Sequence, residues 1–156
     1  MADDKAPGAL DQGTENAALN DALAAEHAAI WGYGVVGAAL DGTARQAAED
    51  AEAAHRDVRD QVGALLSGRH ADVVDARGAY ALPFPVLSAV DAAALGAVLE
   101  EGVATAWVRV LDQAAERSTR ELAVGVLSAA EVRAVGWRGA AGRTPITNAF
   151  PGLPEK

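Results

Sequence analysis

Apolar residues recur every three or four positions in four stretches of the chain, which is the spacing of a helix that buries one face. The stretches cover residues 19–40, 44–65, about 91–114 and about 118–137. Alanine fills many of their positions, and it favours helix because it loses no side-chain rotamer freedom there. The pattern therefore predicts an all-α protein built from four packed helices.

Glycine and proline residues separate the predicted helices. Residues 41–42 (Asp-Gly) predict a short turn, and Gly68 ends the second helix because glycine tolerates the left-handed conformation found there. Pro83 and Pro85 exclude a helix in the next segment, since proline lacks a backbone N–H and restricts the residue before it. About 20 extended residues reach about 60 Å, so the strap at 68–90 can run the length of the bundle.

A short loop, a long crossover and a second short loop are typical of a ferritin-like four-helix bundle, in which two helical hairpins are joined by a strap. We therefore expect a flexible N-terminus at 1–13, the bundle at 14–139 and an irregular C-terminal tail at 140–156. The apolar side chains of the strap should pack on the bundle. The strap residues of interest are Tyr80, Leu82, Pro83, Phe84 and Pro85.

The two predicted hairpins are similar in sequence. A shift of 74 residues places Glu26 on Glu100 and Tyr33 on Trp107, and it places the other inward residues of the first helix on apolar residues of the third. A shift of 76 residues aligns the second helix with the fourth. A duplicated hairpin is consistent with the ferritin-like plan.

One polar residue interrupts the apolar series of each predicted helix. The four residues are Glu26, His55, Glu100 and Glu131. Ionisable side chains are rarely buried unless they are paired or coordinate a metal ion. We therefore predict that these side chains meet in the middle of the bundle.

A dimetal centre is one interpretation of this cluster. In dimetal bundles two helices each supply a Glu and two supply Glu-x-x-His, and Glu52 with His55 fits one such motif. The fourth helix has no histidine, and Ser128 stands three residues before Glu131, so the second motif is incomplete. On this interpretation iron or manganese would be held by Glu26, Glu52, His55, Glu100 and Glu131, and the protein would be a dimetal carboxylate oxidase or hydroxylase.

A buried ionic layer is the alternative, and the sequence favours it. Counting residues from the turns places Arg59 level with Glu26, and Arg133 level with Glu100. Glu26 would then pair with Arg59 or His55, which fixes the register of the helices without chemistry. The expected polar core cluster is Glu26, His55, Arg59, Glu100 and Glu131, in a binding or structural module that needs no cofactor and is not an enzyme.

Composition narrows the function classes further. The formal charge of −9 disfavours binding to nucleic acid and to anionic membranes, and the absence of cysteine excludes disulfides and thiolate metal sites. The first residues do not read as a secretory signal, and no run of about 20 apolar residues could span a membrane. We expect a cytoplasmic protein. A small-ligand pocket between the helices remains a third possible role.

The chain resembles an uncharacterised ferritin-like family, a domain of unknown function common in high-GC Gram-positive bacteria. The resemblance covers about residues 17–154 and rests on five segments. They are 25–29 with Tyr33-Gly34, 54–56 with Arg59-Asp60, the strap at 80–86, Leu99-Glu100, and 150–154. It implies a ferritin-like fold and a homodimer, and it implies no particular reaction.

Overall fold

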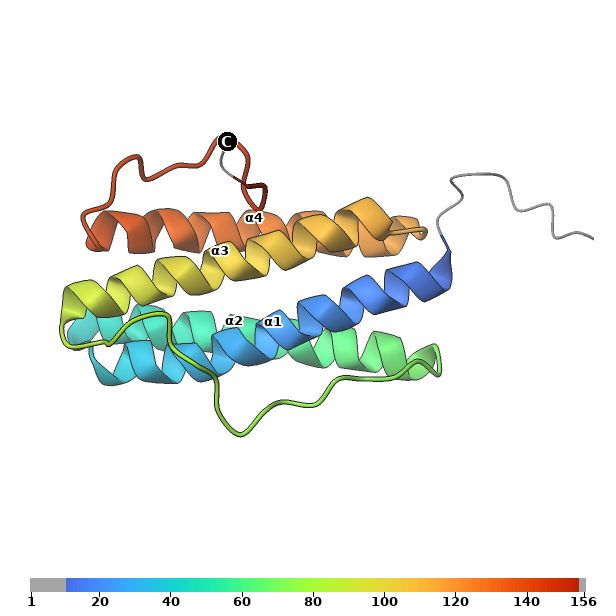
Figure 1. The fold of residues 1–156 in the computed structure, drawn as a ribbon, viewed down its shortest axis with the longest axis horizontal. Helices are drawn as coiled ribbons and strands as arrows, with labels where there is room; N and C mark the ends of the chain where they lie inside the picture. Colours follow the sequence, from blue (N-terminus) through green and yellow to red (C-terminus); the bar gives the residue numbers. More distant parts are fainter. Residues whose placement is uncertain (1–10, 155–156) are drawn as a thin grey trace, which may run out of the picture.

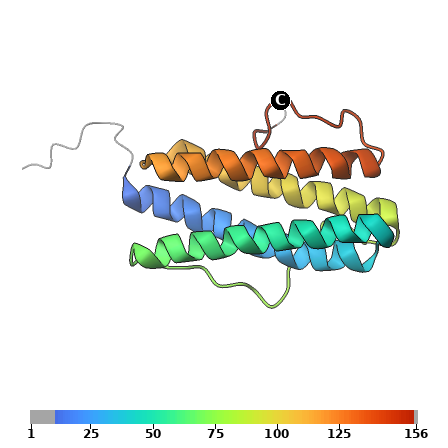
Figure 2. The same ribbon diagram turned by 180° about the vertical axis from the view of Figure 1, so that it is seen from behind.

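The computed structural model describes residues 11–154, and these residues form four α-helices and no strand. The helices are α1 (Gln12–Ala38), α2 (Gly42–Gly68), α3 (Ala89–Gln113) and α4 (Arg117–Ala140). They lie side by side along one long axis (Figures 1 and 2). The prediction of an all-α four-helix bundle is therefore confirmed.

The helices form two antiparallel hairpins. α1 packs against α2 and α3, and α3 packs against α4. The strap between α2 and α3 runs back along the bundle, so that α3 begins at the end where α1 turns into α2 (Figure 1). No helix in residues 11–154 carries an apolar stretch sufficient to cross a membrane.

α1 begins earlier than the apolar series suggests. It starts at Gln12, seven residues before Leu19 and inside the predicted flexible segment 1–13. The cause is local, because the side chain of Asp11 accepts hydrogen bonds from the backbone N–H (2.7 Å) and the hydroxyl (2.9 Å) of Thr14. The rest of the predicted flexible segment, residues 1–10, lies outside the described part of the chain.

The strap packs one side of its chain on the bundle. Alternate residues are partly buried (Tyr80, Leu82, Phe84 and Val86), and the intervening Pro83 and Pro85 are exposed. Leu82, Phe84 and Val86 contact the core near the start of α3. This alternation is that of an extended chain, in which successive side chains point in opposite directions.

Hydrogen bonds from α1 hold the earlier part of the strap. The side-chain amide of Asn20 donates to the carbonyl of Asp72 (2.6 Å) and accepts from the N–H of Val74 (2.9 Å). The ring of His27 contacts the carbonyl of Val74 at 3.1 Å. Two polar side chains of α1 therefore satisfy strap backbone groups that no regular element pairs.

The hydrophobic core is divided into two parts. One part includes Leu19, Leu66 and Trp107, and the other includes Val36 and Leu95. Between them every helix contributes a polar residue, and these residues form the central polar layer described next.

Candidate functional site

His55 of α2 lies at the centre of the polar layer and bridges two carboxylates. Its Nδ1 is 2.6 Å from Oε2 of Glu26 on α1, and its Nε2 is 3.2 Å from Oε1 of Glu100 on α3. All three side chains are buried. The two ring nitrogens therefore both act as donors, which requires the imidazolium form.

Arg133 is the contribution of α4. Its Nε donates to Oε1 of Glu100 at 2.7 Å, and its Nη2 donates to Oε2 at 3.1 Å. This two-pronged contact matches the planar guanidinium to the planar carboxylate. We define the central polar layer as Glu26, His55, Glu100 and Arg133, two acidic and two basic groups.

Three aromatic side chains complete the layer as donors. The indole N–H of Trp107 donates to Glu26 (2.7 Å), and the hydroxyl of Tyr33 donates to Glu100. The indole N–H of Trp137 in turn donates to the Tyr33 hydroxyl at 2.8 Å. In the described residues no buried side-chain nitrogen or oxygen lacks a hydrogen bond.

These contacts are reciprocal between the two hairpins. Glu26 precedes Tyr33 by seven residues on α1, and Glu100 precedes Trp107 by seven on α3, so each pair lies on one helix face. The aromatic residue of each helix donates to the glutamate of the other. The 74-residue shift found in the sequence therefore corresponds to a crossed pair of hydrogen bonds.

The layer holds its groups in their charged forms. Burial alone lowers the pKa of His55, but hydrogen bonds to Glu100 and Glu26 raise it to about 9. Burial raises the pKa of Glu100, yet hydrogen bonds from His55 and Arg133 bring it below its ordinary value. Burial and the nearby Glu100 both raise the pKa of Tyr33, so this hydroxyl stays protonated and remains a donor.

The donor set does not fit a dimetal centre. Both nitrogens of His55 are occupied by carboxylates, so neither offers a lone pair to a metal ion. A guanidinium occupies both oxygens of Glu100. Among residues 11–154 no group of three or more acidic or histidine side chains is arranged to hold a metal ion.

Two residues of α2 that were predicted to belong to the site lie outside the layer. They are Glu52, a predicted metal ligand, and Arg59, a predicted member of the polar cluster. Glu52 forms a surface ion pair with Arg56, four residues later (2.5 Å). Arg59 pairs with its neighbour Asp60 at 2.8 Å and is one-third exposed. Arg59 lies one turn beyond His55 but on the flank of α2, so its guanidinium reaches solvent instead of Glu26.

Glu131 also lies outside the layer, because the inward face of α4 is rotated by one residue from the expected one. Val124 belongs to the same apolar series as Glu131, seven residues before it, and it is 51% exposed, whereas Ala123, Val126 and Ala130 are buried. One residue is about 100° of rotation on a helix. The inward position beside Glu100 is therefore taken by Arg133, two residues after Glu131.

A second buried network lies at the end of the bundle where α1 begins and α3 turns into α4. The sequence analysis did not identify it. Glu15 is fully buried and accepts from the hydroxyl of Thr119 (2.5 Å) and from the N–H groups of Ala115 (2.6 Å) and Glu116 (2.8 Å). Arg69 lies 2.7 Å from the same carboxylate. The signal was present, since Glu15 lies four residues before Leu19 on the same face.

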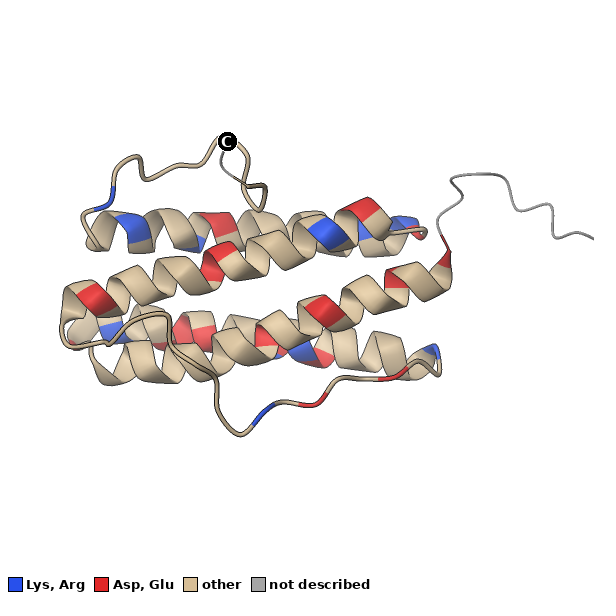
Figure 3. Ribbon diagram, in the orientation of Figure 1, with Lys and Arg blue, Asp and Glu red and all other residues tan. Residues whose placement is uncertain are grey.

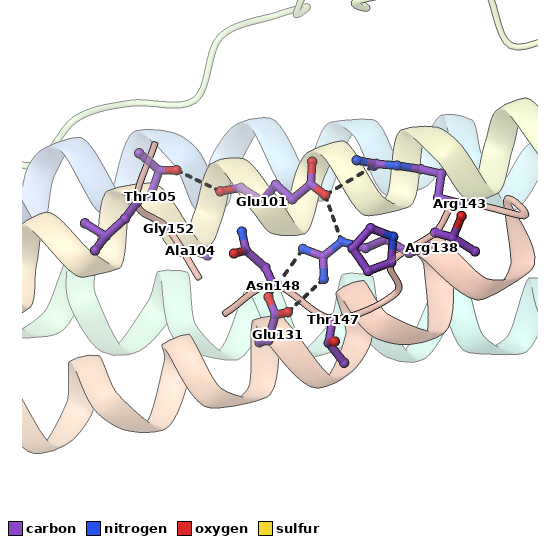
Figure 4. A pocket seen from close by; sticks show the side chains of 12 residues that line it. Glu101, Ala104, Thr105, Glu131, Arg138, Arg143, Thr147, Asn148 and Gly152 are labelled. Atoms are coloured by element: carbon purple, nitrogen blue, oxygen red, sulfur yellow. Dashed lines mark hydrogen bonds and ion pairs between the residues drawn. The ribbon is translucent and has the colours of Figure 1, made fainter. Parts of the chain in front are cut away.

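A polar pocket of about 400 Å³ lies between the C-terminal tail and the outer sides of α3 and α4 (Figure 4). The buried Arg138 donates to Glu131 (2.7 Å) and Glu101 (2.9 Å), and Arg143 lies 3.2 Å from Glu101. The two acidic and two basic groups of this pocket neutralise one another. Figure 4 shows the four side chains meeting across the pocket. Glu131 therefore lines this pocket and is not part of the central polar layer.

Charged positions are interspersed along all four helices (Figure 3). Many of them form surface pairs, such as Arg117 with Glu121 at 2.7 Å and Arg109 with Asp21 at 3.5 Å. Such pairs contribute little to stability. The buried charged groups therefore matter more for the stability of this fold than the surface pairs do.

Comparison with known proteins gives a family and a solved relative. Residues 18–155 match the model of a domain of unknown function, DUF4439. The crystal structure of a conserved hypothetical protein from Mycobacterium tuberculosis is similar, with a TM-score of 0.80 and 40% sequence identity. That match covers 83% of this chain and 98% of the mycobacterial chain. Among curated proteins none matches.

Proposed function

This chain belongs to the family of the domain of unknown function DUF4439, and from its central polar layer we propose that it is a cytoplasmic, ferritin-like bundle that acts as a binding or structural module. The proposal includes no dimetal chemistry. It rests on one observation, which is that His55 bridges Glu26 and Glu100 through both ring nitrogens.

The layer has a structural role in this proposal. Each of its groups finds its donor or acceptor on another helix, so sliding one helix by a turn would leave buried charges without a partner. An unpaired buried charge costs several kcal/mol, far more than a few displaced alanine contacts. The layer would thus specify one register in a core whose many alanines fit several.

Metal analysis tests the proposal directly. Protein purified without added metal should contain far less than one equivalent of iron or manganese, before and after exposure to either ion. About two equivalents, lost in both Glu26→Ala and His55→Ala, would match the stoichiometry of a dimetal carboxylate enzyme and overturn the proposal. The variant Glu121→Ala serves as a control, because Glu121 belongs to no proposed ligand set and forms only a surface ion pair with Arg117.

A homodimer is part of the same proposal. The outer face of α4 exposes uncharged residues over about four turns, including Val124 at 51% and Val132 at 73% exposure. Gly125, Ser128, Ala129 and Gly136 lie on the same exposed face. Small residues allow two helices to approach closely, and an uncharged face loses little hydration on contact.

Light scattering after size exclusion tests the dimer. The natural protein should elute with twice the chain mass of 15.9 kDa. Val132→Asp should elute as a monomer with an unchanged helix content, since the new charge would be buried against its own copy. A monomeric natural protein at micromolar concentration would refute this part of the proposal.

A further inference from the structure

A groove of about 640 Å³ runs between α1, α2 and the strap. Its floor is apolar and is formed by Ile30, Trp31 and Val35 of α1 together with Tyr80 of the strap. The rings of Trp31 and Tyr80 lie with their centroids 6.0 Å apart. The strap thus forms one wall of a cleft over a helix face that would otherwise be open surface.

Gly34 of α1 is an exposed residue on the floor of this strap groove. This residue lines the groove, and a Cβ atom built on it meets no atom within 4 Å. The space is therefore not filled by neighbouring side chains. A side chain added at this position would begin in open space and extend into the groove.

The rim of the groove is basic in an otherwise acidic protein. Arg56, Arg59 and Arg77 line it, and Glu52 is the single acidic residue among its lining residues. Glu52 is neutralised by Arg56 at 2.5 Å, and Arg59 pairs with Asp60 outside the lining. The guanidinium of Arg77 makes no hydrogen bond or ion pair with any residue between 11 and 154.

We propose that the strap groove binds a small amphipathic carboxylate, with the apolar body over Trp31 and Gly34 and the carboxylate at Arg77. An apolar floor with a few convergent polar groups is the usual form of a small-ligand site, and a guanidinium suits a carboxylate. The tail pocket lacks this asymmetry, because its acidic and basic groups are already paired. The inference rests on the proposed function as a binding module and names its ligand class.

Tryptophan fluorescence provides the assay. Trp107 and Trp137 are buried in the core, so Trp31 should report on the groove. Decanoate, kept below its micellar concentration, should give a saturable change that is lost in Trp31→Phe. Decan-1-ol should bind at least tenfold more weakly, and decyltrimethylammonium should give no saturable change, because they lack the anionic head.

Two variants locate the site. Arg77→Gln should weaken decanoate binding about tenfold, a typical effect of losing one charge-assisted contact. Gly34→Leu should abolish binding by filling the groove, while its melting temperature stays the same or rises because leucine favours helix over glycine. Matched controls are Arg117→Gln, remote from the groove, and Gly102→Leu, at an exposed helical glycine whose surroundings are equally open.

Three results would overturn the inference. They are the absence of a saturable signal with decanoate, equal affinity for the alcohol, and unchanged binding in a folded Gly34→Leu variant. Each is independent of the metal analysis. A protein that carries two metal ions would refute the proposed function whatever its affinity for decanoate, and a metal-free protein without decanoate binding would refute only the ligand site.

Discussion

Replacing Arg133 by methionine tests the central polar layer most directly. Methionine preserves much of the aliphatic volume but removes the guanidinium that contacts both oxygens of Glu100. Glu100 is fully buried, so water cannot replace the lost donor without opening the core. Removing one member of a buried ion pair typically costs 3–5 kcal/mol.

Two structural features reduce that figure here. The side chain of Arg133 is 23% exposed, so part of its charge is already solvated. Glu100 also keeps its hydrogen bonds to Tyr33 and His55. We therefore expect Arg133→Met to lower the free energy of unfolding by about 2–3 kcal/mol. With a typical urea dependence for a chain of this size, the midpoint should fall by roughly 1–2 M.

Urea unfolding at pH 7, followed by circular dichroism, provides the measurement. Arg117→Met is the matched control, because Arg117 pairs with Glu121 on the surface and its loss should cost less than about 0.5 kcal/mol. A double-mutant cycle with Glu100→Gln should give a coupling energy of about 1–3 kcal/mol. If Arg133→Met costs no more than Arg117→Met, the layer does not stabilise the fold as argued.

Three further predictions follow from other contacts. The pKa of His55 is about 9 in the folded chain and 6.5 in the unfolded chain, so its stabilisation is complete below pH 6.5 and is lost as the pH rises to 9; urea midpoints should therefore fall between about pH 6.5 and 9, but not in His55→Gln. Gly152→Ala should release the C-terminal tail to proteolysis, since its Cβ would lie 2.6 Å from the Ala104 carbonyl at a φ of +77°. Gly96→Ala should cost about 1–3 kcal/mol and change near-UV circular dichroism, because its Cβ would lie 2.8 Å from the Trp137 ring.

The strap groove gives the crossover a role beyond joining the hairpins. A tight connection is impossible here because α3 begins at the opposite end of the bundle from the end of α2. Since the chain must travel this distance, its side chains cover part of the α1–α2 surface at little further entropic cost. Tyr80 and Arg77 are then carried to positions beside Trp31 that no helix of the bundle occupies.

The sequence alone determined the helices, the strap and the inward faces of α1 to α3. On these helices a polar residue stands alone in its apolar stripe, as Glu26 and Glu100 do, so periodicity defines the face without ambiguity. The spacing of Pro83 and Pro85 likewise excludes a helix in the strap. These signals are local, because they depend on backbone conformation and side-chain spacing among residues that are close in the sequence.

Only the tertiary structure decided the inward face of α4 and the pairing within the layer. On α4 apolar residues occur in adjacent pairs, such as Ala123-Val124 and Ala129-Ala130, so two stripes one residue apart fit the pattern equally well. Contact with α3 selects the stripe that presents Arg133 to Glu100, because a buried carboxylate needs a cation more than the core needs the larger valine. The choice depends on a neighbour 33 residues away in the chain, which periodicity within one helix does not encode.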